Sequence, residues 1–222
     1  MASEDQIQSI YRLRWVGYGL LLLAVFDVIQ LLLPPNYQDA VWVLQTVGAI
    51  VERVPVPLLG LLLIFFGEDA ERTNIEDILL KVLRWVTLLL AIGFLAMVPL
   101  SVAYTFRIDS QNNQQIAALQ ERQATQLDTV EERVTKGSAE DIKNLGNELN
   151  RMGVPVDPQK PDELKTKILE RIASAKTQVP TQAKLTKDNQ RLALLKNAVK
   201  WTIGALVSSV LLFMIWRSTG WV

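Results

Sequence analysis

The feature that most constrains this chain is the gathering of its apolar residues into long, almost uncharged runs. Residues 15–33 contain a single charged side chain, Asp27, and two prolines follow the run at positions 34–35. A helix of this length reaches roughly 28 Å, close to the hydrocarbon thickness of a bilayer. Residues 82–106 and 199–216 are two further runs, with charges only near their ends. The three runs predict an integral membrane protein.

A fourth apolar region, residues 37–66, allows two structures. Its last part, residues 54–66, begins with two closely spaced prolines and as a helix would reach only roughly 20 Å. In the first structure, residues 37–53 form a helix in the membrane interface, and residues 54–66 cross or enter the membrane. In the second, one kinked helix crosses, and Glu52 and Arg53 neutralise each other. We favour the first, which brings the total to about four transmembrane helices.

The expected fold is therefore an all-α polytopic membrane protein in three parts. Residues 1–106 form an N-terminal membrane region, with spans at about 15–33, 54–66 and 82–106 and the interfacial helix at about 37–53. Residues 107–198 form an extramembrane helical segment resembling a coiled coil, and residues 199–222 hold the last span.

Side chains that flank the spans predict their boundaries and orientation. The rings of Trp15, Trp85, Trp201 and Trp216 lie near span ends and fit an interfacial belt. With four spans, one side collects the basic residues of the termini and short loops, which are Arg12, Arg14, Arg72, Lys81, Arg84 and Arg217. This distribution places both termini in the cytoplasm and residues 107–198 on the opposite side. If residues 54–66 only enter the membrane and return, residues 107–198 are cytoplasmic instead.

The extramembrane segment is expected to be a helical hairpin. It contains no aromatic residue, so a compact globular core is not expected. Gly137 should end a first helix, Ser138 and Asp141 form the start of a second, and Pro161 begins a third, with Pro180 ending a linker. Apolar residues at helical spacing form either a partner-facing stripe or part of a solvated stalk; they are Ile116, Leu119, Leu127, Val130, Val134, Ile142, Leu145 and Leu149.

Few residues in this chain suit catalysis. The sequence has no His and no Cys, which removes the commonest general base and every thiol nucleophile. We find no glycine-rich phosphate loop and no zinc-binding spacing, so no catalytic residue and no metal site is expected. Nucleic-acid binding is not expected either, because the lysines of residues 143–176 alternate with acids and lack interleaved aromatics.

Asp27 is the one acid deep inside a strongly apolar run. A carboxylate in a membrane is a candidate functional group by default, either for proton transfer or for a polar contact between helices. We favour the polar contact, because the spans offer no second proton-accepting group beside Asp27. Glu52 and Arg53 are the other candidates for an intramembrane polar contact.

The run ERVPVPLLGLLLIFFGE, residues 52–68, resembles the membrane core of the cyanobacterial HpsJ-like proteins. The order of elements is similar as well: one span, a proline-bearing segment, another span, a Gln-rich helical insertion and a last span. The resemblance implies a cyanobacterial membrane protein without known catalytic residues. The family is named after hormogonium polysaccharide secretion, and its members in unicellular cyanobacteria imply a broader role in the thylakoid or plasma membrane.

Three functions follow as hypotheses. The first is a non-catalytic accessory, assembly or scaffold subunit of a photosynthetic membrane complex, with membrane lipids and photosystem or antenna subunits as partners. The second is a component of a polysaccharide secretion apparatus, and the third is a small transporter that uses Asp27. No cofactor is predicted, although lipid, chlorophyll or carotenoid could bind at an interface. Without His, a chlorophyll would need an amide, an acid, a backbone carbonyl or water as its magnesium ligand.

Overall fold

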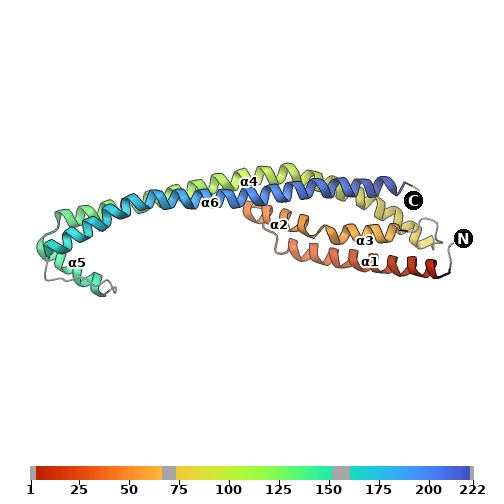
Figure 1. Cartoon of the computed structure of the whole chain (residues 1–222), viewed down its shortest axis with the longest axis horizontal. Helices are drawn as coiled ribbons and strands as arrows, with labels where there is room; N and C mark the ends of the chain where they lie inside the picture. Colours follow the sequence, from red (N-terminus) through yellow and green to blue (C-terminus); the bar gives the residue numbers. More distant parts are fainter. Residues whose placement is uncertain (1–3, 67–73, 152–160, 221–222) are drawn as a thin grey trace. The chain divides into compact units, whose positions relative to one another are not determined.

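The computed structural model describes residues 4–66, 74–151 and 161–220, and every regular element among them is an α-helix (Figure 1). The helices are α1 (Glu4–Leu32), α2 (Ala40–Arg53), α3 (Pro55–Phe65), α4 (Asn74–Lys136), α5 (Ala139–Arg151) and α6 (Pro161–Ser218). Four helical stretches are long and apolar enough to cross a membrane: Gln8–Leu32, Ala40–Phe65, and parts of α4 and α6. The expected all-α fold with four membrane-spanning helices is confirmed.

The chain forms two compact units. Unit 1 comprises Met1–Asp109 and Ala193–Val222, and unit 2 comprises Ser110–Leu192. The sequence placed the corresponding boundaries at residues 107 and 198. Helices α4 and α6 contribute residues to both units.

Helices α2 and α3 follow each other with one residue, Val54, between them. Val54 keeps right-handed helical dihedrals between α2 and α3 (φ −58°, ψ −27°), and the Leu58 amide donates to its carbonyl at 3.1 Å. Ala40–Phe65 is thus a continuous helical stretch of 26 residues, long and apolar enough to cross a membrane. The prolines lie in the first turn of α3, where a missing amide proton costs least, so they bend the chain without ending the helix.

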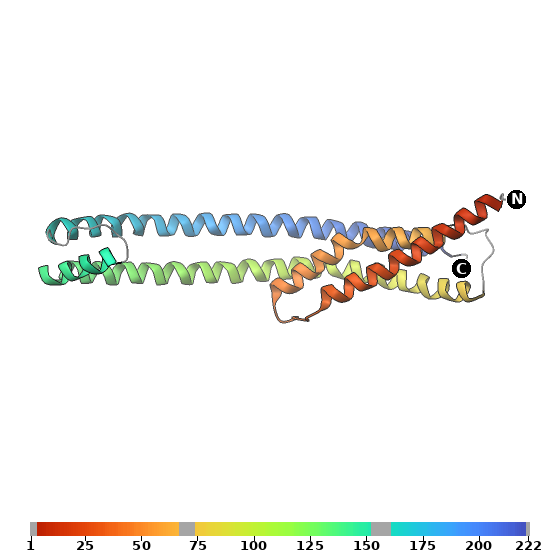
Figure 2. The ribbon, with the colours of Figure 1, turned by 90° about the horizontal axis from the view of Figure 1, so that it is seen from below.

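Unit 1 is held together by close helix contacts. Helix α1 runs beside α3 (Figures 1 and 2), and the two approach closely at Gly17 and Gly60. Helices α4 and α6 share hydrogen bonds: the Ser209 hydroxyl donates to the Ala91 carbonyl at 2.8 Å, and the hydroxyls of Ser101 and Thr202 lie 3.0 Å apart. The main buried cluster consists of Val51, Val54, Leu61, Ile64, Phe65, Leu80, Ala91, Phe94, Ala205 and Leu212.

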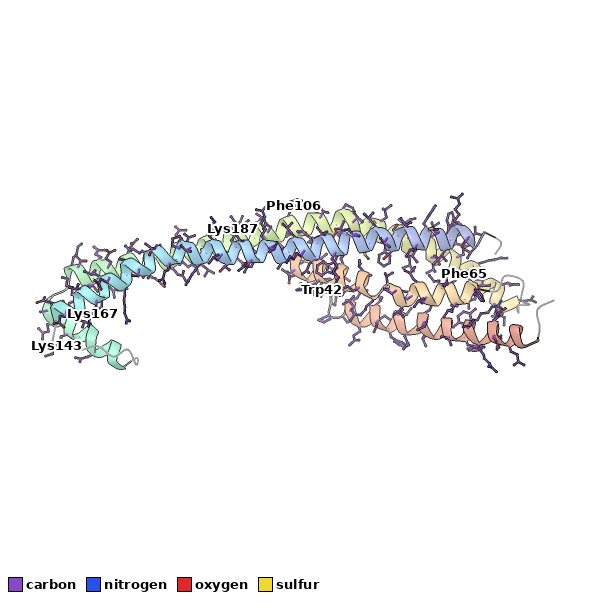
Figure 3. All side chains as sticks on the ribbon, viewed as in Figure 1. Trp42, Phe65, Phe106, Lys143, Lys167 and Lys187 are labelled. Atoms are coloured by element: carbon purple, nitrogen blue, oxygen red, sulfur yellow. The ribbon has the colours of Figure 1, made fainter. Side chains whose placement is uncertain are left out.

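The outside of unit 1 is also apolar. Only 6% of the most apolar stretch of α1 is buried inside the protein. The exposed side chains of this helix include Leu22, Leu23 and Phe26. On α4, Phe106 is 70% exposed (Figure 3). Apolar side chains exposed over whole helices would be costly in water, whereas lipid chains accommodate them. The surface therefore fits a membrane environment.

Unit 2 is a helical hairpin, in which α4 and α6 run side by side (Figures 1 and 2). Its buried apolar cluster consists of Val134, Ile142 and Leu164, with Ile168 and Leu169 packed against them. Helix α4 ends before Gly137 and α6 begins at Pro161, as the sequence predicts. The segment expected to link α5 and α6, residues 153–158, lies outside the described residues.

The expectation that Pro180 ends a linker is wrong, because this residue lies inside a helix. Helix α6 continues through it, although proline removes one backbone hydrogen bond. A contact to α4 holds α6 one turn before the proline, where Lys176 pairs with Asp128 and Glu131. The Thr181 hydroxyl also donates to the Thr177 carbonyl at 3.1 Å. Tertiary contacts and the helix on both sides outweigh the local loss.

Helix α5 begins with the expected capping box. The backbone amide and the hydroxyl of Ser138 donate to Asp141 Oδ2 at 2.9 and 2.7 Å, and the Asp141 amide donates back to Ser138 Oγ at 3.3 Å. The two hydrogen bonds that the carboxylate accepts, first the one from the Ser138 hydroxyl and then the one from its amide, favour the ionised form and lower the pKa of Asp141 below its ordinary value.

The start of α5 should therefore loosen in acid. Because the folded-state pKa is lowered, the stabilisation is present above the ordinary carboxyl pKa and is lost as the pH falls through the lowered value. We expect hydrogen exchange at the first amides of α5 to accelerate over this acid range, relative to the intrinsic rates. In Asp141→Asn the same amides should be less protected near neutral pH and should lack this pH dependence. An acid response that persists in Asp141→Asn would assign it to another group.

Candidate functional site

Charged side chains from three helices meet in unit 1, beside the bend between α2 and α3. Lys200 Nζ lies 2.6 Å from Glu52 Oε1, and the Trp201 indole N–H donates to the same oxygen at 3.1 Å. Arg53 Nε lies 3.8 Å from Asp27 Oδ2. We call these five residues, Asp27, Glu52, Arg53, Lys200 and Trp201, the charged cluster.

Small residues allow the helices that carry the cluster to approach. Gly48 on α2 lies against the ring of Trp201, and a Cβ atom at this position would overlap the indole. One turn further along α6, a Cβ at Gly204 would lie 2.5 Å from Val51 Cγ1. Close backbone approach at small residues is the usual way in which membrane helices pack. It brings the end of α2 within reach of Lys200.

The cluster lies toward one end of the apolar part of the bundle. Along α1, Asp27 is roughly 18 Å beyond Trp15, and five residues of the helix follow it. Along α6, Lys200 is roughly 24 Å from Trp216. About half of each side chain is exposed, from 48% for Glu52 and Arg53 to 65% for Lys200. Charges in such surroundings are costly when isolated, and pairing reduces that cost.

The cluster is electrically balanced, with two acids and two bases. Its hydrogen bonds and ion pairs connect α1 and α6 to the last turn of α2. Chemically, it can hold three helices together, and its carboxylates can also exchange protons. In the described part of the chain, no group of three acidic, His or Cys side chains could hold a metal ion.

The sequence identified three members of the cluster but not how they pair. One of the two structures considered for residues 37–66 paired Glu52 with Arg53, whereas the structure pairs Glu52 with Lys200 and Arg53 with Asp27. Consecutive side chains on a helix point about 100° apart, so neighbours rarely face each other. Lys200 and Trp201 were missed because each looked like an ordinary residue at a span boundary. No signal in a single sequence joins positions 148 residues apart.

The second set of candidates from the sequence is the apolar stripe of the hairpin, and its residues differ in how far the structure buries them. Val134 is 1% exposed and Ile142 is 3% exposed, so both pack inside unit 2, which corrects the expectation that they face a partner. Leu119 and Val130 are exposed, whereas Ile116 and Leu127 are half-buried. The side chains of Leu145 and Leu149 lie outside the described part of the structure. The stripe thus combines internal core with open surface.

Comparison with known proteins places the chain in a family. A family model described as "HpsJ-like protein" matches residues 8–220, which include the charged cluster and the whole hairpin. No curated protein and no solved structure matches the chain. Because the match covers nearly the full length, the chain belongs to the HpsJ-like family.

Proposed function

We propose that this protein is a non-catalytic accessory or scaffold subunit of a larger membrane complex, in which unit 2 binds the partner. The observation that carries this proposal is the open apolar surface of unit 2. Leu119, Leu185 and Leu192 are each more than half exposed, on a hairpin that contains no aromatic residue.

Two helices alone offer little burial. All residues of α4 from 121 to 126 and of α6 from 184 to 192 are exposed, so the middle of the hairpin has almost no core of its own. Most helical stability in proteins comes from packing an apolar face against a neighbour. A partner that covers these leucines would supply the missing contact, and this supports a binding role.

The complex that we propose first is a photosynthetic one in a cyanobacterial thylakoid membrane, with both termini in the cytoplasm. The grouping of basic residues at the end of unit 1 where α1 begins and α6 ends supports the orientation. The resemblance to family members from unicellular cyanobacteria supports the membrane. A polysaccharide secretion apparatus is the alternative, supported by the process after which the family is named.

Site-specific photo-crosslinking in the native membrane tests the proposal. A photoreactive residue at Leu119 or Leu185 should capture photosystem or antenna subunits, identified by mass spectrometry. The same residue at Val134, which is buried, is the matched control and should react only within the chain. Capture of export-machine subunits would support the alternative complex. No adduct at any exposed position of unit 2 would contradict the binding role.

The charged cluster supports one further candidate function, transport of protons or ions. Polar groups beside a bent membrane helix are a recurring arrangement in transporters. If transport is the function, Asp27→Asn should abolish the proton flux of reconstituted vesicles, read with a pH-sensitive dye. Asp39→Asn is the control, since Asp39 only caps α2 and Asn caps equally well. An unchanged flux in Asp27→Asn would contradict transport through the cluster.

A further inference from the structure

One face of α6 within unit 2 carries a short heptad pattern. Leu185 and Leu192 are seven residues apart, so they project from the same side of the helix, and they are 58% and 53% exposed. Lys184 and Arg191 each precede one of these leucines and lie along one flank of the same stripe. We call these four residues the basic leucine face.

The cations of this face differ from other cations of unit 2. Lys176 pairs with Asp128 and Glu131 on α4, and Lys165 donates to the Thr135 carbonyl at 2.9 Å. Among the residues that the structure describes, neither Lys184 nor Arg191 forms an ion pair.

The neighbouring helix explains this difference. Since the helices are antiparallel and Lys176 lies opposite Asp128, residues 184–192 lie opposite roughly residues 112–120 of α4. That stretch contains no charged side chain. Helix α4 therefore supplies no counter-charge to this flank, whose one acid is Asp188 of α6 itself.

The charges of the basic leucine face indicate which kind of molecule could bind to it. When two helices pair, the residues beside the apolar stripe form ion pairs between the helices, and these ion pairs determine which helices associate. A second copy of this chain would offer either Gln182 and Asn189, which are uncharged, or the same flank, on which two cations outnumber the single acid Asp188. A lipid surface is disfavoured because the segment has no Trp or Phe and only a narrow apolar stripe.

We propose that the basic leucine face binds an amphipathic helix of a partner protein, whose apolar stripe is flanked by Asp or Glu. This inference rests on the proposed binding role of unit 2 and names the chemistry of the partner. Leucines of the two helices would pack together, while Lys184 and Arg191 would pair with the acids. Asp188 lies on the same flank, between the two cations along α6. It favours a partner helix that has one Lys or Arg opposite Asp188.

A peptide-binding experiment tests the charge pattern directly. The full-length protein in nanodiscs of phosphatidylcholine is titrated with a labelled helical peptide about three heptads long, with leucines in its stripe and glutamates beside it. The peptide should bind, and Lys184→Glu/Arg191→Glu should weaken its affinity about tenfold or more. The reversed variant should instead bind a matched peptide in which lysines replace the glutamates.

Variants of the same helix provide the control. Lys167→Glu/Lys187→Glu changes the net charge equally, and both positions are exposed (Figure 3), but neither flanks the leucine stripe. This variant should keep the wild-type affinity. Leu185→Gln/Leu192→Gln should lose binding while its circular dichroism stays unchanged, since neither leucine is buried.

Several results would overturn the inference. Equal binding of acidic and basic peptides, or equal loss in the control variant, would show that the pattern carries no selectivity. Leucine-dependent self-association would assign the face to a second copy, and face-dependent binding of unit 2 to phosphatidylglycerol vesicles would assign it to lipid. The crosslinking experiment distinguishes failure of this inference from failure of the proposed binding role. Capture of a partner protein from Leu119 but not from Leu185 would keep the binding role of unit 2 and reject the basic leucine face. No capture from any exposed position of unit 2 would reject the binding role itself.

Discussion

Replacing Gly17 with valine should lower the thermal midpoint of the purified protein by several degrees, while the same replacement at Gly19 should leave it unchanged or slightly raised. A Cβ atom at Gly17 would lie 2.7 Å from Ile64 Cγ1 and 2.8 Å from the Gly60 carbonyl oxygen. The carbonyl belongs to the backbone of α3, so it cannot rotate away, and α1 and α3 must separate. Overpacking of this kind costs about 1–3 kcal/mol, and a branched side chain adds to the clash.

Gly19 is the matched control for this prediction. It lies on the same helix, and no atom lies within 4 Å of a Cβ built there. Valine also replaces glycine favourably for helix formation. Circular dichroism melts in one detergent would measure both variants. Equal midpoints for the two valine variants would show that α1 does not pack on α3 through Gly17.

Loss of the contact between Glu52 and Lys200 should give the second large effect. Glu52→Gln should destabilise the protein by about 1–2 kcal/mol, because Lys200 then loses its counter-charge in an apolar environment. Lys200→Gln should cost a similar amount. The estimate is kept low because both side chains are about half exposed or more, and detergent or headgroup water screens the pair.

A charge exchange separates pairing from other causes. Glu52→Lys/Lys200→Glu should recover much of the lost stability, but not all of it, because Trp201 loses its acceptor. Thermal melts of the wild type, Glu52→Lys, Lys200→Glu and the exchange variant in one nanodisc composition form a double-mutant cycle. Asp27→Asn should have a smaller effect, since its ion pair is longer, at 3.8 Å. Additive effects in the cycle would contradict a direct interaction between Glu52 and Lys200.

Features that depend on neighbouring residues could be predicted from the sequence. Helix α1 ends at Leu32, just before the two prolines, and α5 begins with the capping box of Ser138 and Asp141. The four membrane-spanning helices were predictable because length and the absence of charge suffice to favour a span. In each case the cause lies within one or two turns of chain, or in the composition of a single helix.

Features that depend on distant residues could not be predicted in this way. The prolines after Arg53 and the proline at position 180 suggest interruptions, yet the chain stays helical around both. In each case the helix continues if side-chain packing offsets the one backbone hydrogen bond that proline removes. This packing involves residues distant in the sequence, so it is known only from the folded structure. The same holds for Val134 and Ile142, which looked like a partner surface and proved to be core.

The sequence by itself determined the helical class of this protein, the number of its membrane spans, most helix ends and the absence of the usual catalytic residues. Only the tertiary structure decided that the chain stays helical from α2 through Val54 into α3, and that Glu52 meets Lys200 while Arg53 meets Asp27. The tertiary structure also decided which apolar residues of the hairpin are buried and which are exposed. The reason is physical: helix formation and membrane insertion depend on short stretches of chain, whereas ion pairing and burial depend on which helices approach each other. In this protein those approaches occur at small residues such as Gly48, whose importance shows only when the opposing ring is in place.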